Sequence, residues 1–352
     1  MATNSERLTY AAAQTARVAF YGAHYLAARL VARDAFAEID PPKHRLPSLR
    51  ATLFAMRDLF RQDWANAEAG HYPLPLNLRD EMRRAQASLR FLADIPKVAA
   101  RRRRHGHDET PAKGQGLPRY YRQNFHFQTD GYLSADSAKL YDFQVEALFA
   151  GTADAMRRRA FMPVAEALKG RSLSRARLLD IGAGTGRFLS LAKSALPELR
   201  AVALDLSEPY LERARRALRH VKGISFVGAP AEAIPLADGS IDVAIGIYLF
   251  HELPPKIRTA VAREIGRVLK PGGTFVLSDS IQFGDAPEFD GLIEVFPDLV
   301  YEPYYAGYTK CDLDALFAPA GLHRIATDIA YLTKIAVFQK PRSKRRRSVH
   351  ES

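Results

Sequence analysis

The sequence predicts an α/β fold, with a mostly parallel, doubly wound sheet in the second half of the chain and a helical extension before it. Three observations support this. Hydrophobic residues make up 47% of the 352 residues, which is enough for a large buried core. From residue 175 onward, short apolar runs alternate with helical patterns, as in parallel strands joined by crossover helices. The first half instead has the Ala-rich, Arg-bearing periodicity of helices.

Each helix of the first half is predicted from its periodicity and its caps. Ser48 follows a proline and is expected to start a helix, and Ser134 and Thr152 are each able to cap another one. The helices expected before these last two cover residues 8–36, 49–67 and 77–104.

The strands of the second half are predicted from apolar runs bounded by turn residues. They are expected at 176–181, 201–206, 224–227, 241–248, 274–278 and 332–339. Helices are expected at 187–195, 209–220, 254–269 and 312–318.

These elements suggest a division into domains. Residues 1–170 are expected to form a mostly helical N-terminal cap or extension, and residues 171–340 the sheet domain. An exposed linker is expected at 105–118, which holds three glycines, two prolines and no apolar period. Residues 341–352 are expected to be a basic disordered tail.

The formal net charge of +12 is concentrated outside the sheet domain, because residues 176–340 carry a net charge of −2. Basic runs at 101–104, 157–159 and 344–347 could neutralise phosphates or attract anionic lipid. No aromatic residues are interleaved with them for base stacking, so solvated helix ends are favoured over a nucleic-acid surface. Peripheral contact with a membrane stays open.

Cys311 is the single cysteine, so the chain can form no internal disulfide, and no Cys/His cluster has the spacing of zinc ligands. A reducing, cytoplasmic location and the absence of a metal site are therefore predicted. The most apolar stretch near the start, residues 11–31, contains charged side chains, which argues against a transmembrane segment.

The strongest chemical signal is a glycine-rich turn. An apolar strand ends in Asp180, and Gly182, Gly184 and Gly186 then open a helix. Glycines let a ligand approach the backbone, and a helix N-terminus offers free N–H groups to a carboxylate. A dinucleotide site would need glycine at position 187, where this chain has Arg187. A glycine turn without a ligand is the alternative.

The second predicted strand ends at Asp205, nineteen residues after Gly186. A carboxylate there can accept both hydrogens of a ribose diol. A helix-capping role is the alternative, but Ser207 can serve as that cap. The two features together describe a nucleoside with a carboxylate-bearing tail, which S-adenosylmethionine fits better than a pyrophosphate cofactor.

Three further segments, 231–243, 248–253 and 267–273, complete a set of motifs. With them the sequence resembles the class I S-adenosylmethionine-dependent methyltransferases, in particular the small-molecule subgroup called type 11. The resemblance covers residues 175–340. It implies a Rossmann-like doubly wound methyltransferase sheet with an antiparallel last strand, and S-adenosyl-L-methionine as the cofactor.

The resemblance also implies a cofactor site. The methionine end would lie on the three glycines with Asp180 beneath it, the ribose on Asp205, and the adenine edge along Ala231 and Glu232. Pro230 stands where relatives often have an acid, so backbone groups would recognise the adenine. The implied cofactor-binding residues are Asp180, Gly182, Gly184, Gly186, Asp205, Leu206, Ala231 and Glu232.

Methyl transfer depends mostly on positioning, and a general base is needed only if the acceptor loses a proton. The catalytic candidates are Tyr248, which would lie near the reactive methyl, and His251, for which a structural role in a strand-to-helix turn is equally open. Tyr304 and Tyr305 are further candidates for the base. His251 does not start a zinc-protease motif, because no second histidine follows four residues later.

The acceptor pocket is expected above the carboxyl ends of the strands, from residues 281–309 and the aromatic run 120–132. These residues suggest a flat or apolar small molecule, unless they form a contact between the halves. The predicted activity is O- or C-methyl transfer. The alternatives are an RNA or protein methyltransferase that docks through the basic half, and a non-catalytic protein with this fold. The sequence does not predict the oligomeric state.

Overall fold

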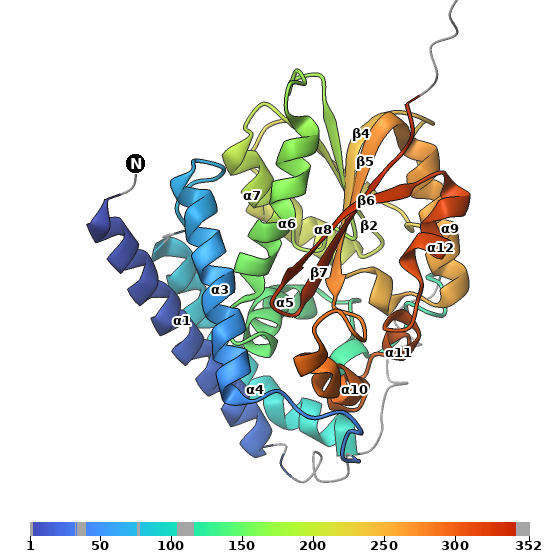
Figure 1. Cartoon of the computed structure of the whole chain (residues 1–352). Helices are drawn as coiled ribbons and strands as arrows, with labels where there is room; N and C mark the ends of the chain where they lie inside the picture. The colour runs from blue at the N-terminus through green and yellow to red at the C-terminus, as the bar shows by residue number, and fades with distance from the viewer. Residues whose placement is uncertain (1–2, 32, 34–39, 76–77, 104–115, 343–352) are drawn as a thin grey trace, which may run out of the picture.

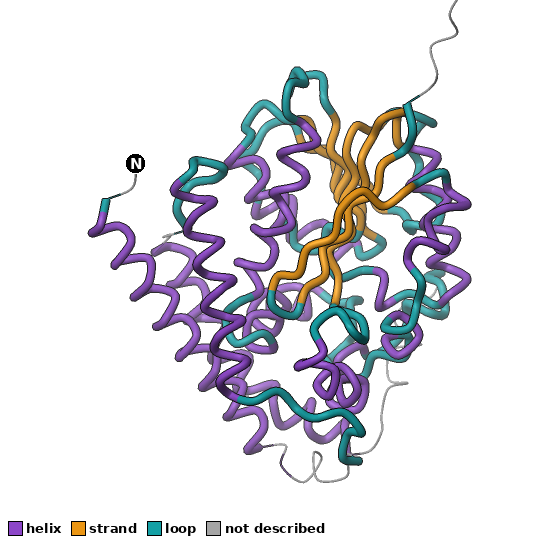
Figure 2. Tube along the Cα trace, in the orientation of Figure 1, coloured by secondary structure: helices purple, strands orange, loops and turns teal. Residues whose placement is uncertain are grey.

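The computed structural model describes residues 3–31, 33, 40–75, 78–103 and 116–342. A seven-stranded sheet lies at its centre in the order β3-β2-β1-β4-β5-β7-β6, with helices on both faces (Figures 1 and 2). The strands are β1 (Arg177–Ile181), β2 (Arg200–Asp205), β3 (Ile224–Gly228), β4 (Ile241–Ile247), β5 (Leu269–Ser280), β6 (His323–Ala330) and β7 (Thr333–Gln339).

The first five strands are parallel, and β7 runs antiparallel to both β5 and β6. The predicted Rossmann-like sheet with its antiparallel last strand is therefore confirmed. Strand β6 has no counterpart in the sequence prediction. It is an edge strand whose first five residues are exposed, so its sequence lacks the apolar alternation that identifies a half-buried strand.

The two faces of the sheet bury separate hydrophobic clusters, because neighbouring strand residues point to opposite sides. In β1, Leu178 packs with the first cluster and Leu179 with the second. The first face is covered by α6 (Ala153–Leu168), α7 (Arg187–Ala195) and α8 (Glu208–Ala217), and the second by α9 (Pro255–Val268) and α12 (Leu313–Phe317).

The N-terminal helices form an outer layer beside α6 (Figure 1). Ser48 and Ser134 cap their helices as predicted, since their side chains accept from the N–H groups of Ala51 and Ser137. Thr152 precedes α6 but makes no side-chain cap bond. The layer consists of α1 (Asn4–Val31), α3 (Leu49–Glu68), α4 (Leu78–Arg103) and α5 (Ala135–Leu148).

The extension and the sheet share one core, since Leu59 and Ala67 of α3 belong to the same hydrophobic cluster as Leu178 of β1. The division at residue 170 stays a prediction. Most of the predicted linker and all but two residues of the predicted tail lie outside the described residues.

The expected solvated helix end at 157–159 is wrong, because Arg157 and Arg158 are buried. The Arg158 guanidinium binds both carboxylate oxygens of Asp63 in α3, at 2.6 and 2.8 Å. Arg157 pairs with Asp154 within α6 at 3.1 Å and lies 3.8 Å from Glu146 of α5. A buried charge requires such a partner, so these arginines fasten helices together and are not available to phosphates.

One close approach between helices leads to a stability prediction. A Cβ atom at Gly266 in α9 would lie 2.2 Å from the Ala320 carbonyl oxygen, whereas a Cβ at Gly22 in α1 would meet nothing within 4 Å. We expect Gly266→Ala to destabilise the fold by about 1–3 kcal/mol through overpacking. Gly22→Ala should instead stabilise it by about 0.5–1 kcal/mol, because alanine favours helix. Equal shifts of Tm for the two variants would contradict this contact.

Candidate active site

A cavity of about 740 Å³, part of it open to solvent, lies at the carboxyl ends of β1, β2 and β4. We call it the cofactor cavity. Most of the predicted cofactor residues lie on its wall, together with Tyr248 at the end of β4. The predicted residues that line it are Gly182, Gly184, Asp205, Leu206, Ala231 and Tyr248. The other predicted residues do not line this cavity. They are Asp180, Gly186, Glu232 and His251.

The glycine loop needs glycine for two different reasons. All three glycines have positive φ, with values of 71°, 54° and 76° for Gly182, Gly184 and Gly186. A Cβ atom at Gly184 would have no neighbour closer than 4.0 Å, so this part of the loop leaves open space for a ligand. A Cβ at Gly186 would lie 2.8 Å from Leu218 Cδ1, so Gly186 serves the packing of α7 on α8.

Two buried carboxyl groups lie at this loop. Asp205 accepts the Gly184 N–H at 2.7 Å and the Ser207 N–H at 2.8 Å, yet burial still raises its pKa. Asp180 is buried, and its Oδ2 atom has no hydrogen-bond partner among the described residues. Burial and the charge of Asp205 raise the pKa of Asp180 to about 8. The pair therefore favours a ligand that brings hydrogen-bond donors or positive charge.

Residues 120–132, which we call the closing segment, fold over the carboxyl ends of the strands. Tyr121 and Tyr132 line the cofactor cavity, and the Tyr132 carbonyl accepts from Ser207 Oγ at 2.6 Å. Glu232 does not line the cavity. Its carboxylate oxygens accept from the Tyr120 hydroxyl at 2.7 and 2.9 Å, so it fastens the closing segment instead.

A second cavity of about 600 Å³, the acceptor cavity, adjoins the first one, and the two share Tyr141, Tyr248 and Glu252. Helices α5 and α10 (Asp290–Leu299) each contribute three side chains to its wall, which is largely apolar. The apolar lining residues are Val145, Leu148, Phe149, Ile281, Leu292, Ile293, Phe296 and Leu332.

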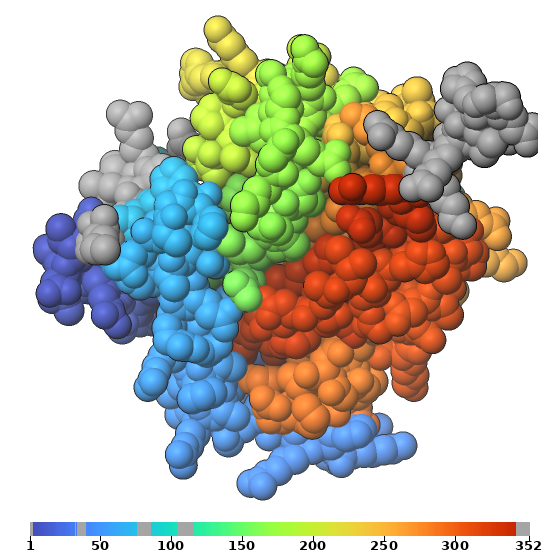
Figure 3. All heavy atoms as spheres, turned by 45° about the horizontal axis from the view of Figure 1, so that its top comes forward, coloured from blue at the N-terminus to red at the C-terminus, as the bar shows by residue number. Residues whose placement is uncertain are grey.

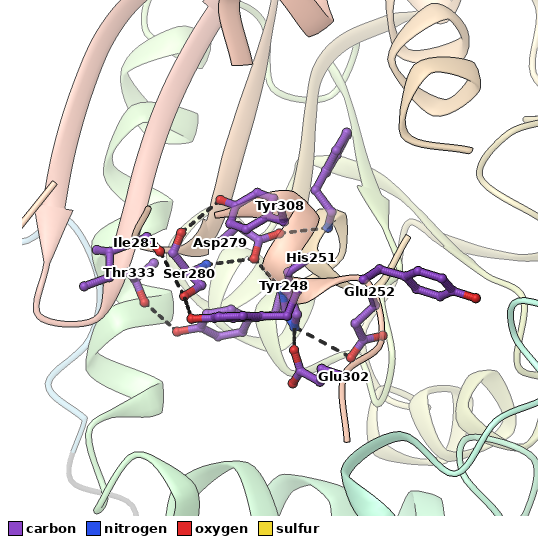
Figure 4. A network of polar contacts seen from close by, with 12 residues as sticks. Tyr248, His251, Glu252, Asp279, Ser280, Ile281, Glu302, Tyr308 and Thr333 are labelled. Atoms are coloured by element: carbon purple, nitrogen blue, oxygen red, sulfur yellow. Dashed lines mark hydrogen bonds and ion pairs between the residues drawn. The ribbon is translucent and has the colours of Figure 1, made fainter. Parts of the chain in front are cut away.

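One end of the acceptor cavity is polar, and Figure 4 shows its central residues. His251 Nδ1 lies 2.5 Å from Asp279 Oδ1, and its Nε2 faces Glu302 at 3.4 Å and Glu252 at 3.9 Å. His126 of the closing segment approaches Glu302 at 2.9 Å. The Tyr132 hydroxyl donates to Glu252 Oε1 at 2.5 Å. Two imidazoles and three carboxyl groups thus meet beside the boundary between the cavities.

His251 and Glu252 of this cluster have different pKa values. Burial alone would lower the pKa of His251, but Asp279 and Glu302 outweigh it and raise the pKa to about 10. Burial raises the pKa of Glu252 to about 7, against the opposing charges of His251 and His126. At neutral pH, His251 therefore holds its proton, and Glu252 is the group that can accept one.

Tyr248 lines both cavities. Its ring stacks on Phe149, with centroids 5.5 Å apart, and its hydroxyl lies 2.6 Å from Thr333 Oγ1. Burial raises the pKa of Tyr248, so its hydroxyl keeps its proton near neutral pH. The backbone of Tyr248 has φ of 51°, a conformation that few non-glycine residues adopt and that often marks functional sites.

Glu252, Asp279, Glu302 and His126 are site residues that the sequence alone does not predict. The signal for Glu252 was present, because this acid directly follows His251 after a strand end. Within the described part of the chain, no group of three or more His, Cys, Asp or Glu side chains could hold a metal ion. None of the helices in the described ranges is long and apolar enough to span a bilayer.

The sheet order with its antiparallel β7, the glycine loop and Asp205 are features that fit one class of protein, the class I S-adenosylmethionine-dependent methyltransferases. Residues 178–273 match the protein family described as "Methyltransferase domain". The chain therefore contains a class I methyltransferase domain, and S-adenosylmethionine is the cofactor of this class.

Several relatives match about a third of the chain. Malonyl-[acyl-carrier protein] O-methyltransferase of Methylococcus capsulatus is 39% identical over 111 residues, which are 32% of this chain and 38% of that protein. The ubiquinone/menaquinone biosynthesis C-methyltransferase UbiE of Methylobacterium nodulans is 37% identical over 126 residues, 34% of this chain and 48% of that protein. The chain thus matches less than half the length of either relative. The mitomycin 7-O-methyltransferase MmcR is a distant structural neighbour, with 20% identity, a TM-score of 0.44 and 57% of each chain aligned.

The residues of the cofactor cavity fit S-adenosylmethionine. Gly184 leaves the space that a Cβ would fill, and the carboxylate of Asp205 can accept from ribose hydroxyls. Asp180 has a pKa of about 8 and is therefore mostly protonated near neutral pH, and a cationic ligand close to the glycine loop would favour its carboxylate form.

Proposed function

We propose that this protein methylates an O or C atom of a small, apolar or aromatic molecule bound in the acceptor cavity. The observation that carries this proposal is the contact between the two cavities at Tyr141, Tyr248 and Glu252. A methyl donor in one cavity and an acceptor in the other would meet beside a carboxylate able to take a proton.

The bound cofactor supplies an electrophilic methyl group, and the protein supplies position and a place for a proton. The apolar walls hold the acceptor and exclude water. Glu252 takes the proton that the acceptor loses, since its pKa of about 7 matches neutral conditions. The protonated His251 holds the negative charges of Glu252 and Glu302 in place.

The cavity favours a small molecule over a nucleic acid or a protein. Its walls are mostly aliphatic and aromatic side chains, and the closing segment contributes His126 to one end. Docking through the basic half loses support as well, because Arg157 and Arg158 are committed to buried ion pairs.

A methyl-transfer screen tests this proposal. The full-length protein is incubated with methyl-labelled S-adenosylmethionine and a cell extract, and the labelled product is identified by mass spectrometry. We expect the label in a small apolar or aromatic compound. Label in RNA or protein would support the docking alternative, and no label despite cofactor binding would support the non-catalytic alternative.

The role of Glu252 leads to a prediction for its neighbour Tyr132. The Tyr132 hydroxyl donates to Glu252 and lowers its pKa, so Tyr132→Phe should raise that pKa and move the rising limb of the pH–rate profile to higher pH. The ring, which stacks on Phe125 with centroids 5.3 Å apart, is kept in this variant. Measurement of kcat against pH checks it, and an unmoved profile would remove Glu252 as the titrating group.

A further inference from the structure

The first turns of α3 carry an exposed surface that is both basic and apolar. Leu49, Leu53 and Phe54 are 74%, 52% and 67% exposed, and Arg50 and Arg57 are exposed beside them. We call these five side chains the α3 outer face. No acidic residue occurs between positions 41 and 57, whereas Lys43 and Arg45 add positive charge just before the helix.

Helical spacing explains why these residues share a side. Positions 49, 50, 53, 54 and 57 recur at intervals of three and four, so they form one stripe along the helix. Leu59, on the opposite side, is buried at 3% exposure. The core of the protein is therefore already served by the inner side of α3, and the outer leucines and phenylalanine have no role in it.

We propose that the α3 outer face binds the surface of an anionic lipid bilayer. A bilayer accepts both parts of this face at once, with apolar side chains at the acyl boundary and arginines among anionic headgroups. A nucleic acid would pair with the arginines and leave Leu49, Leu53 and Phe54 exposed to water. A symmetric contact with a second copy would bring Arg50 and Arg57 toward their own counterparts, and like charges repel.

The α3 outer face lies next to a segment that contacts helix α10. The segment before α3 runs along α10, as Figures 1 and 3 show, and a Cβ at Gly291 would lie only 2.5 Å from the Arg45 carbonyl oxygen. The backbone N–H of His44 donates to Glu294 of α10 at 2.9 Å. On the inner side of α3, Ala55 packs against the cluster that contains Ile293.

Helix α10 in turn forms part of the acceptor cavity wall, through Leu292, Ile293 and Phe296. Binding through the α3 outer face would therefore place this wall close to the bilayer, from which an apolar acceptor could be drawn. This last step rests on the proposed function, whereas the membrane contact itself does not.

The experiment is co-sedimentation of the full-length protein with vesicles of phosphatidylcholine, with and without phosphatidylglycerol. We expect binding only to the vesicles that contain phosphatidylglycerol. The double variant Leu53→Ser/Phe54→Ser should weaken binding at least about tenfold, through loss of buried apolar surface. The double variant Arg50→Glu/Arg57→Glu should weaken it at least about twentyfold, through loss of attraction to the headgroups.

Two matched variants outside the α3 outer face serve as controls. Leu8 is 72% exposed near the N-terminal end of α1, and Arg213 is an exposed arginine of α8. Leu8→Ser and Arg213→Glu should bind vesicles like the unaltered protein. Calorimetric binding of S-adenosylmethionine in every variant separates loss of the membrane contact from loss of the fold. Absence of vesicle binding, equal loss in the controls, or a dimer that Phe54→Ser dissociates would overturn the proposal.

Discussion

Replacement of Glu252 by glutamine is expected to lower kcat by about 10²–10⁴-fold, the usual contribution of a positioned general base. Glutamine keeps the size of the side chain but cannot take up a proton. The carboxyl group lies where the two cavities meet, and burial raises its pKa to about 7. The two cavities also share Tyr141 and Tyr248, but burial raises the pKa of both tyrosines, so their hydroxyls keep their protons near neutral pH.

The pH dependence of kcat provides a second test of Glu252 as the general base. The active form is the carboxylate, so kcat should be low below about pH 7 and rise as Glu252 loses its proton. His251, His126, Glu302 and Tyr132 face this carboxyl, and the pKa of His251 is raised to about 10, so it stays protonated throughout that rise. Glu252→Gln should abolish the rise.

Tyr248→Phe is the matched control, because it keeps the ring stacked on Phe149 and removes only the hydroxyl bound to Thr333. It should retain the rise with pH. A Glu252→Gln variant with unchanged kcat, beside a Tyr248→Phe variant without activity, would transfer the role of base to Tyr248.

Replacement of Asp205 by alanine is expected to raise the Kd of S-adenosylmethionine by about 10- to 100-fold. Hydrogen bonds to a charged group contribute about 1.5–3 kcal/mol, which corresponds to this range of affinity. The variant also removes the acceptor of the Gly184 N–H, so the glycine loop would lose one of the bonds that hold it against β2 and keep those that Gly182 and Ala183 donate to the Leu204 carbonyl.

Asp205→Asn separates these two effects, because its amide oxygen can still accept the Gly184 N–H while the negative charge is gone. We expect an intermediate Kd for this variant, measured by calorimetry with S-adenosylhomocysteine in parallel. Thermal unfolding of both variants controls for loss of structure. Unchanged affinity in folded Asp205→Ala would remove Asp205 from the ribose site.

Local signals in the sequence were enough to predict every strand of the sheet except β6, and much of the cofactor cavity. The turn from Asp180 to Gly186 and the strand end at Asp205 each involve a few adjacent residues, and their chemistry follows from backbone geometry alone. Gly186 and Glu232 belong to the same motifs, but their contacts with Leu218 and Tyr120 depend on the packing of α8 and the closing segment.

The acceptor cavity could not be predicted in the same way. His126, Glu252, Asp279 and Glu302 come from four separate places in the sequence, and only the fold brings them within reach of one another. The raised pKa of Glu252 results from burial, which has no local sequence signal. The burial of Arg158 could not be predicted for the same reason, because its partner Asp63 lies 95 positions away in the sequence.

The central claim is that the glycine loop and Asp205 form a site for S-adenosylmethionine beside an acceptor cavity. The most direct test is a calorimetric titration of the full-length protein with S-adenosylmethionine, and with NAD as the competing nucleotide. The structure predicts saturable one-to-one binding of S-adenosylmethionine that Gly184→Val abolishes, and no binding of NAD. Binding of NAD in preference, or binding of S-adenosylmethionine that Gly184→Val leaves unchanged, would contradict the account.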